Sequence, residues 1–404
     1  MGQNPAPLHA PIPAAALYVH IPFCKAKCDY CDFFSVPLPP DAAVPDKYVA
    51  AVCGDIARQR ENLRAVETLY LGGGTPSLLS PRQLGRIVAA VHTQCGLADS
   101  AEITLEANPA DITGGFLSAA ADAGVNRLSV GVQSFSREAL RAAHRTLQNG
   151  MTSAAPPAGT PDALDSLFGT LSRSWRGTVS VDLIAGLPGE TAASFRGGLT
   201  RLIGARPHHI SLYALTLEDG TPLRRAVRSG AVRFSEEATD DMWLAGRDML
   251  EAAGYGQYEV SNFALAGCEC RHNQAYWRLD SYVGAGAGAV GTVFFADGTG
   301  LRHTRPADVA AYIRSAGGAA GGDERLGLGT ALFECLMLGF RTREGVSAWA
   351  FAERFGAPLA ERIGADGGAF MRWEREGRAE RDGDRYRLTR EGLLFLNRFL
   401  AELA

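Results

Sequence analysis

The sequence predicts an α/β fold: a partial (β/α)6-type barrel followed by a small C-terminal α+β domain of winged-helix-like character. Three observations lead to this prediction. Between residues 16 and 217, six short apolar, β-branched runs alternate with helix-like stretches, and each run leads into glycine or polar residues. A helical C-terminal part then follows the glycine-rich segment 317–322. Strands that alternate with helices are typical of parallel βα units, whose buried strands are almost continuously apolar.

The predicted strands lie at 17–21, 68–71, 103–106, 128–132, 179–184 and 210–214. Amphipathic stretches at 81–93 and 116–123 are predicted helices. In parallel sheets and barrels, binding and catalytic groups gather at the carboxyl ends of the strands. The glycine and polar residues that end these runs are therefore the first candidates for a functional site.

We expect four regions along the chain: an N-terminal extension (1–16), a barrel with its closing segment (17–300), a linker (301–325) and a C-terminal domain (326–404). The stretch 149–162 is rich in small and turn-forming residues and is predicted to be a mobile surface loop. In the C-terminal domain we expect a helix at 326–340 and a short strand at 382–388. Thr389 is expected to cap the last helix.

Composition excludes several classes of protein. The chain has 404 residues, 46% of them hydrophobic and 21% charged, which is ordinary for a globular protein. A formal net charge of −4 gives no general attraction to nucleic acid or to an anionic membrane surface. No apolar run approaches the roughly 20 residues of a membrane span, and the N-terminus lacks the pattern of an export signal. We therefore expect a cytoplasmic protein with no nucleic-acid partner and no stable membrane insertion.

Three of the eight cysteines crowd into one segment, Cys24, Cys28 and Cys31, with C-x3-C-x2-C spacing. In a reducing compartment such crowding indicates metal or cluster ligation rather than disulfides. Zinc sites usually have four protein ligands, and Cys268 with Cys270 would be needed to complete one. Three close thiols better suit three irons of a [4Fe–4S] cluster, with the fourth iron open to another ligand.

This cysteine motif, with an aromatic residue before its last cysteine, resembles the signature of the radical S-adenosylmethionine (SAM) superfamily. The resemblance implies that the amino and carboxylate groups of SAM chelate the open iron. It also implies that an electron donor reduces the cluster if SAM is cleaved. The turn Gly72-Gly73-Gly74-Thr75-Pro76 resembles the GGGTP turn of the same family, where bare backbone contacts the methionine end of SAM.

Over about its first three hundred residues the chain resembles the coproporphyrinogen III oxidase-like branch of that superfamily. The residues on that branch's SAM-contact positions are Tyr18, Tyr30, Gly73, Gly74, Thr75, Glu106, Gln133, Arg145, Asp182, Ala214 and Val290. A carboxylate such as Asp182 accepts hydrogen bonds from ribose hydroxyls or an ammonium group, and Arg145 can pair with the carboxylate of SAM. The family usually has a histidine two residues after this arginine, where the present chain has Leu147.

Two functions compete within the branch: oxygen-independent coproporphyrinogen III dehydrogenase, which decarboxylates propionate side chains oxidatively, and the HemW-type heme chaperones, which bind heme and pass it to an acceptor protein. The dehydrogenase carries a fourth cysteine two residues after the third, but Asp32 and Phe33 follow Cys31 here. Its N-terminal arm is also longer. The segment 272–277 (His-Asn-Gln-Ala-Tyr-Trp) matches the H-N-x-x-Y-W motif of the chaperones, so the resemblance favours a heme chaperone.

The same segment offers suitable chemistry for heme. The imidazole of His272 is a good axial ligand for iron, and Tyr276 and Trp277 supply flat aromatic surface for a porphyrin. Cys270 is a rival ligand. A purely structural role, with His272 fixing a loop and Trp277 filling the core, remains an alternative at this point. A third possibility, a radical SAM methyltransferase or maturase, would lack this motif. If the chain does perform radical chemistry, no residue in the sequence stands out as its catalytic acid or base.

Overall fold

The central feature of the fold is one large sheet. The computed structural model of the chain describes residues 10–39, 41–144, 161–318 and 321–403. Its 12-stranded sheet has the strand order β14-β13-β12-β11-β1-β4-β5-β6-β7-β8-β10-β9. Neighbouring strands from β11 to β8 run parallel, and those at both margins run antiparallel. The first and last strands of this order, β14 and β9, do not pair with each other. The sheet therefore stays open and forms a partial barrel, as predicted.

Each of the six predicted apolar runs lies inside a parallel strand. These strands are β1 (Ala14–Ile21), β4 (Leu63–Gly73), β5 (Leu97–Ala107), β6 (Arg127–Gln133), β7 (Thr178–Ala185) and β8 (His209–Ala214). They follow one another in the sheet in the order in which they occur in the chain. Consequently their carboxyl ends meet along one edge, which is the arrangement that gathers a site in such folds.

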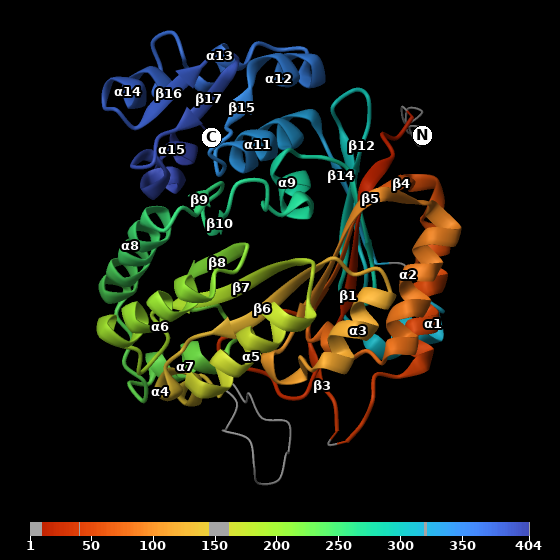
Figure 1. Cartoon of the computed structure of the whole chain (residues 1–404). Coiled ribbons are helices and arrows are strands. Elements are labelled where there is room, and N and C mark those ends of the chain that lie inside the picture. Colours follow the sequence, from red (N-terminus) through yellow and green to blue (C-terminus); the bar gives the residue numbers. More distant parts are fainter. Residues whose placement is uncertain (1–9, 40, 145–160, 319–320, 404) are drawn as a thin grey trace.

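Helices cover the outer face of this sheet (Figure 1). They are α1 (Asp46–Arg58), α2 (Pro81–Cys95), α3 (Gly114–Asp122), α5 (Pro161–Ser174), α6 (Ala192–Ala205) and α8 (Glu236–Ala252). The short helices α4 (Arg137–Ala142) and α7 (Pro222–Arg228) lie instead at the carboxyl ends of the strands. The helices predicted at 81–93 and 116–123 are confirmed as α2 and α3. Ser80 begins α2 in a capping box with Gln83, and Thr113 caps α3. The predicted loop 149–162 lies almost entirely outside the described residues.

The segment expected as a linker, 301–325, is instead part of the sheet. Beyond the barrel strands the chain forms β9 (Gly256–Gln257), β10 (Asn262–Ala264), α9 (Arg271–Trp277), β11 (Tyr282–Ala285), β12 (Val290–Phe294), β13 (Gly300–Thr304), α10 (Val309–Arg314) and β14 (Gly322–Leu326). β13 pairs with both β12 and β14. Arg305 forms two hydrogen bonds, 2.7 and 3.1 Å, with the buried carboxylate of Asp55, which also accepts one from Tyr312. These bonds attach the segment to α1.

At the N-terminal end of the described chain, β1 already starts at Ala14, inside the predicted extension 1–16.

The C-terminal part has the expected α+β composition. It consists of α11 (Leu328–Gly339), β15 (Val346–Ser347), α12 (Ala348–Phe355), α13 (Leu359–Ile363), α14 (Ala369–Arg375), β16 (Ala379–Asp382), β17 (Arg385–Leu388), the 3-10 turn η4 (Gly392–Phe395) and α15 (Leu396–Leu403). The strands form a small sheet of order β15-β17-β16. Thr389 accepts a hydrogen bond from the Gly392 amide (3.1 Å), but the N-cap residue of the 3-10 turn is Glu391, so the helical segment begins two residues later than predicted.

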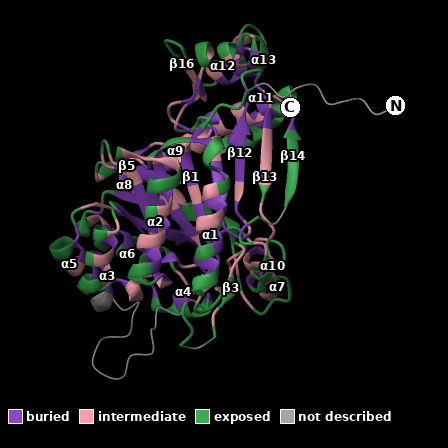
Figure 2. Cartoon of the chain, turned by 90° about the vertical axis from the view of Figure 1, so that its right-hand side faces the viewer, coloured by how far each residue is buried: buried purple, intermediate pink, exposed green. Residues whose placement is uncertain are grey.

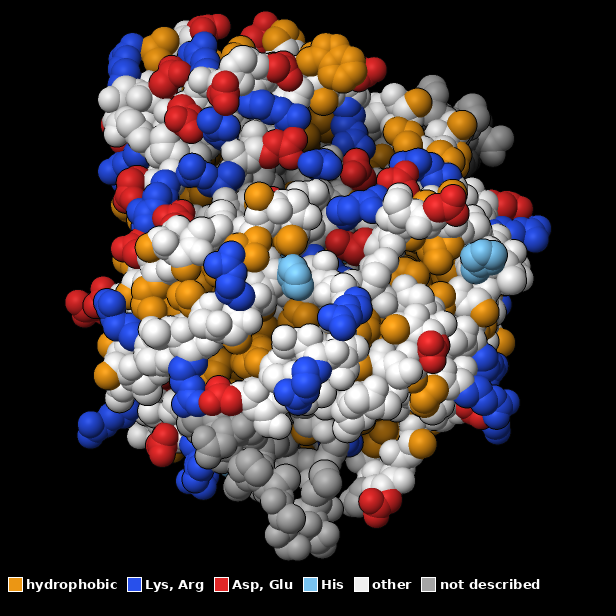
Figure 3. All heavy atoms as spheres, in the orientation of Figure 1, with side chains coloured by type: hydrophobic (Ala, Val, Ile, Leu, Met, Phe, Trp, Pro, Cys, Tyr) orange, Lys and Arg blue, Asp and Glu red, His pale blue; other side chains and the backbone are white. Residues whose placement is uncertain are grey.

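The central strands are the most buried part of the molecule, and the helices around them are exposed on their outer sides (Figure 2). The face in Figure 3 mixes acidic and basic side chains, with hydrophobic ones scattered among them. Within the described ranges, we find no helix that combines the length and the apolar character needed to cross a bilayer.

Candidate cofactor site

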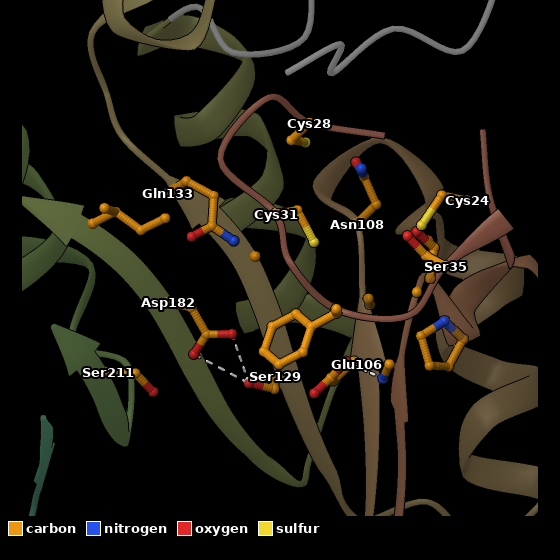
Figure 4. A pocket seen from close by; sticks show the side chains of 18 of the residues that line it. Cys24, Cys28, Cys31, Ser35, Glu106, Asn108, Ser129, Gln133, Asp182 and Ser211 are labelled. Atoms are coloured by element: carbon orange, nitrogen blue, oxygen red, sulfur yellow. Dashed lines mark hydrogen bonds between the residues drawn. The ribbon is translucent and has the colours of Figure 1, made fainter. Parts of the chain in front are cut away.

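A cavity of about 450 Å3 opens at the carboxyl ends of the parallel strands. Its wall contains the predicted cluster ligands Cys24, Cys28 and Cys31. It also contains the predicted SAM contacts Tyr30, Gly73, Gly74, Thr75, Glu106, Gln133, Asp182 and Ala214. In Figure 4 the three cysteines lie along one loop above Glu106, Ser129 and Asp182, which project from neighbouring strands. Residues from distant parts of the sequence are thus brought to one cavity, as the strand-end rule predicts.

The cysteine loop is attached to its surroundings on two sides. It begins at β2 (Phe23–Cys24), which pairs with β3 (Val36–Pro37). On one side Lys25 donates to the Asp111 carboxylate (2.9 Å), which also accepts from Ser77 (2.7 Å). On the other side Asp29 bonds to His144 (2.6 Å), and its main chain bonds to the main chain of Ala143 and Leu223. These contacts, which the sequence did not reveal, hold the loop over the strand ends.

The donor set of this loop fits a [4Fe–4S] cluster. All three thiols are half-buried and face the same cavity. Burial raises the pKa of Cys31, and this thiol has to lose its proton to bind iron as a thiolate. Cys270 lines the same cavity but lies toward the amino ends of the strands, 3.5 Å from Glu102, and Cys268 is not among the residues that line the cavity. The described residues therefore do not assemble the four-cysteine zinc site that the sequence left open.

The glycine turn after β4 is shaped by close packing. Gly73 has φ of 113°, and a Cβ atom there would lie 2.5 Å from the ring of His20. A Cβ on Gly74 would lie 2.7 Å from the carbonyl oxygen of Phe23, which directly precedes Cys24. Only glycine can adopt this backbone without displacing the segment that carries the cysteines. The turn thus presents its main chain to the cavity, as expected for a SAM contact.

Two carboxylates line the cavity below the cysteines. Glu106 accepts hydrogen bonds from the Tyr70 hydroxyl (2.9 Å) and from the Gly73 amide (3.0 Å), so it also orients the glycine turn. Burial, followed by the charge of Asp182, raises the pKa of Glu106 to about 7. Asp182 accepts from Ser129 at 3.0 and 3.2 Å. Both carboxylates are placed to receive hydrogen bonds from a cationic or hydroxyl-bearing ligand.

Gln133 has an unusual backbone conformation. Its φ is 68°, and it lies at an irregularity in the pairing of β6 with β7. A non-glycine residue in the left-handed region costs free energy, and such residues cluster at binding sites. This bend directs the Gln133 side chain into the cavity (Figure 4).

Two of the predicted SAM contacts, Tyr18 and Val290, are not among the cavity-lining residues. Tyr18 lies behind the wall, where its hydroxyl bonds to His20 Nδ1 (2.9 Å). His20 Nε2 in turn donates to the carbonyl of Phe34 (2.9 Å), which follows the cysteine loop. Tyr18 and His20 together therefore hold the chain at the end of that loop. Val290 begins β12, with its main chain packed against Gly284. Arg145 lies outside the described residues, so its role stays a prediction.

The residues predicted to bind heme lie on α9, where His272 is buried and Tyr276 is half-buried. His272 is 1% exposed, and both of its ring nitrogens form 2.9 Å hydrogen bonds, to Thr68 and to the hydroxyl of Tyr276. Burial lowers the pKa of His272 to about 3, which keeps the imidazole neutral. Trp277 is half-buried. These contacts give His272 a structural role in this conformation, and its role as a heme ligand stays a prediction.

Comparisons with known proteins agree with these features. Residues 18–197 match the Radical SAM superfamily model, and residues 329–395 match the HemN C-terminal domain. A Lactococcus lactis protein named heme chaperone HemW is 34% identical over 340 residues, which is 84% of each chain. An Escherichia coli protein of the same name is 39% identical over 73% of this chain and 74% of its own. The bovine mitochondrial radical S-adenosyl methionine domain-containing protein 1 is also 39% identical, but only 66% of its length is covered.

Among solved structures, coproporphyrinogen III oxidase (HemN) from Escherichia coli, described as a radical SAM enzyme, superposes with a TM-score of 0.78. The match covers 96% of this chain and 89% of that one at 20% identity, and it establishes the shared fold. The sequence matches, the cysteine loop and the glycine turn all indicate the same relationship. The chain therefore belongs to the radical SAM superfamily, in the coproporphyrinogen III oxidase-like branch that includes the proteins named heme chaperone HemW.

Proposed function

We propose that this protein is a cytoplasmic heme chaperone that carries a [4Fe–4S] cluster, binds SAM and passes heme to an acceptor protein. The observation that carries the proposal is the H-N-x-x-Y-W segment at 272–277, which forms α9 beside the cofactor cavity. The loop around Cys31 supports it as well, because Asp32 and Phe33 follow where the dehydrogenase has its fourth cysteine. The relatives named heme chaperone HemW support the same proposal by similarity over most of the chain.

In this proposal the cavity residues divide the cofactor binding among themselves. Cys24, Cys28 and Cys31 hold the cluster, which supplies one-electron chemistry toward SAM when an external donor reduces it. The glycine turn and Gln133 position SAM, and Glu106 and Asp182 receive its hydrogen-bond donors.

His272 would ligate the heme iron, with Cys270 as its rival. His272 is neutral, so binding iron would cost it no proton, but a bond to iron would have to replace its hydrogen bond to Tyr276. Cys270 is buried and its pKa is raised to about 12, first by burial and then by Glu102, so it must also lose a proton. His272 is buried and does not line the cavity, so this ligand would require α9 to open, whereas Cys270 is buried but lines the cavity.

An anaerobic heme titration of the cluster-reconstituted protein, followed by the Soret band, tests the proposal. We expect saturable binding of about one heme per chain, lost or spectrally altered in His272→Ala and unchanged in His92→Ala, an exposed histidine on α2. Tyr276→Phe should bind heme about 2- to 10-fold more tightly, because a hydrogen bond worth about 0.5–1.5 kcal/mol no longer competes for the imidazole.

Binding that His272→Ala leaves unchanged would overturn the ligand assignment and transfer it to Cys270. The absence of saturable binding in the wild type would overturn the chaperone proposal. The alternative, oxygen-independent coproporphyrinogen III dehydrogenase, would then be measured by turnover of coproporphyrinogen III with SAM and a reductant.

A further inference from the structure

Below the carboxylates of the cofactor site, the cavity has a second, deeper set of polar residues. This floor layer consists of Tyr70, Thr104, Arg127, Ser180 and His209, all of which line the cavity. Tyr70 pairs in register with Thr104, and Thr104 with Arg127, so these three lie side by side on β4, β5 and β6. Ser180 pairs with His209 on β7 and β8. The interiors of closed (β/α) barrels are usually filled by branched apolar side chains, so a polar floor is a departure from ordinary core packing.

Two groups of the floor layer lack a hydrogen-bond partner among the described residues: the Thr104 hydroxyl and Nη2 of Arg127. Thr104 is 1% exposed and Arg127 is 3% exposed. The other three residues are bonded, Tyr70 to Glu106, Ser180 to His209, and His209 also to Tyr258. Buried polar groups are nearly always paired, and an unpaired one costs free energy. Two such groups on neighbouring strands, facing one cavity, indicate a binding function.

Both unpaired groups are hydrogen-bond donors and one of them is cationic, which suits an anion even though Glu106 and Asp182 lie higher in the same cavity. Arg127 Nη1 donates to the Cys268 carbonyl (3.0 Å) and lies 3.8 Å from Glu102. Glu102 is shared, because it also accepts from the main-chain amides of Arg271 (3.2 Å) and His272 (3.0 Å). Burial lowers the pKa of His209 well below its ordinary value, which leaves the guanidinium as the cation of the floor layer. An arginine N–H beside a hydroxyl is a donor pair that matches a carboxylate.

We propose that the floor layer binds a carboxylate group, which accepts hydrogen bonds from Arg127 Nη2 and Thr104 Oγ1. The carboxylate belongs either to a propionate of a tetrapyrrole or to a separate small acid. In the first case the inference rests on the proposed function, and in the second case it is independent of it.

A second pocket makes the choice of test residue important. Arg127 also lines a pocket of about 330 Å3 together with Arg176, His208 and Arg271. An anion that reached Arg127 from that side would contact these residues and not Thr104, which lines only the cavity. Thr104→Val therefore reports on the floor layer, and Arg176→Gln reports on the outer pocket. Valine keeps the shape of threonine and removes a hydroxyl that has no described partner, so the fold should tolerate it.

The first experiment uses 3,3,3-trifluoropropionate as a probe, with fluorine NMR on the full-length, cluster-reconstituted protein without SAM. We expect saturable binding that Thr104→Val weakens at least 3-fold and Arg176→Gln leaves unchanged. The proposal is overturned by an absence of saturable binding, by equal binding to wild type and Thr104→Val, or by a loss of binding in Arg176→Gln.

A second experiment identifies the source of the carboxylate by titrating hemin and its dimethyl ester. If a propionate occupies the floor layer, esterification and Thr104→Val each weaken binding, and Thr104→Val has no effect on the ester. If a separate acid occupies it, Thr104→Val changes binding of the probe but not of hemin. Probe binding without any hemin binding would support the floor site while overturning the proposed heme function.

Discussion

At the scale of single residues, Glu106 connects the fold to the cofactor site. It accepts hydrogen bonds from the Gly73 amide and the Tyr70 hydroxyl, and the charge of Asp182 acts on it within the same cavity. Its pKa is raised to about 7, whereas the unfolded chain would release this proton near 4.5. Protonation therefore stabilises the native state relative to the unfolded chain, and this stabilisation is complete below the unfolded pKa.

This shift predicts a pH dependence of stability in the SAM-free protein. As pH rises from about 4.5 to about 7, the Glu106 contribution should be lost at up to about 1.4 kcal/mol per pH unit, and the curve should then level off. Urea unfolding of wild type and Glu106→Gln across this pH range isolates the contribution of Glu106. The other carboxyl groups with a raised pKa, such as Glu190 and Glu259, are present in both proteins. Parallel pH profiles for the two proteins would contradict the assignment.

At the scale of elements, the sequence predicted the strands well because apolar, β-branched runs of this kind have few alternatives to a buried sheet. It missed β13 and β14, because short strands such as Gly322–Leu326 at a sheet margin are mostly exposed and carry no apolar pattern. The site was predictable where a motif marks it, as in the cysteine loop. The anchoring bonds from Lys25 to Asp111 and from Asp29 to His144 join residues too far apart in the chain to be paired from sequence.

The glycine turn between β4 and α2 provides the prediction at this scale. Gly73→Ala should lower the free energy of unfolding by about 1–3 kcal/mol and weaken SAM binding at least 10-fold, since its Cβ collides with the His20 ring at a positive φ. Gly85→Ala is the matched control. It lies inside α2 with no atom within 4 Å of the added Cβ, and it should stabilise by about 0.5–1 kcal/mol without affecting SAM. Urea unfolding and SAM calorimetry measure both effects, and normal SAM affinity in Gly73→Ala would contradict the predicted role of the turn.

At the scale of the whole molecule, the C-terminal domain is not a separate unit on a linker. Its hydrophobic core includes Leu279, which follows α9, and Phe294 at the end of β12. Arg354 of α12 lies 4.8 Å from the Phe294 ring and donates to the Leu279 carbonyl (2.8 Å). On the other side, Arg390 pairs with Asp248 and Glu251 of α8. The domain thus packs against the α9–β12 region that carries the H-N-x-x-Y-W motif (Figure 1).

Because this core is shared, the molecule should unfold in a single cooperative transition. Phe294→Ala, which removes a 1% exposed ring from the shared core, should lower the free energy of unfolding by about 3–5 kcal/mol and shift that whole transition. Trp349→Ala removes an aromatic ring that is 68% exposed on the same domain, and it should change stability by no more than about 0.5 kcal/mol. Differential scanning calorimetry distinguishes the cases. Two separate transitions, with only one shifted by Phe294→Ala, would mean that the barrel and the C-terminal domain fold independently. In that case, opening of α9 would leave the C-terminal domain intact.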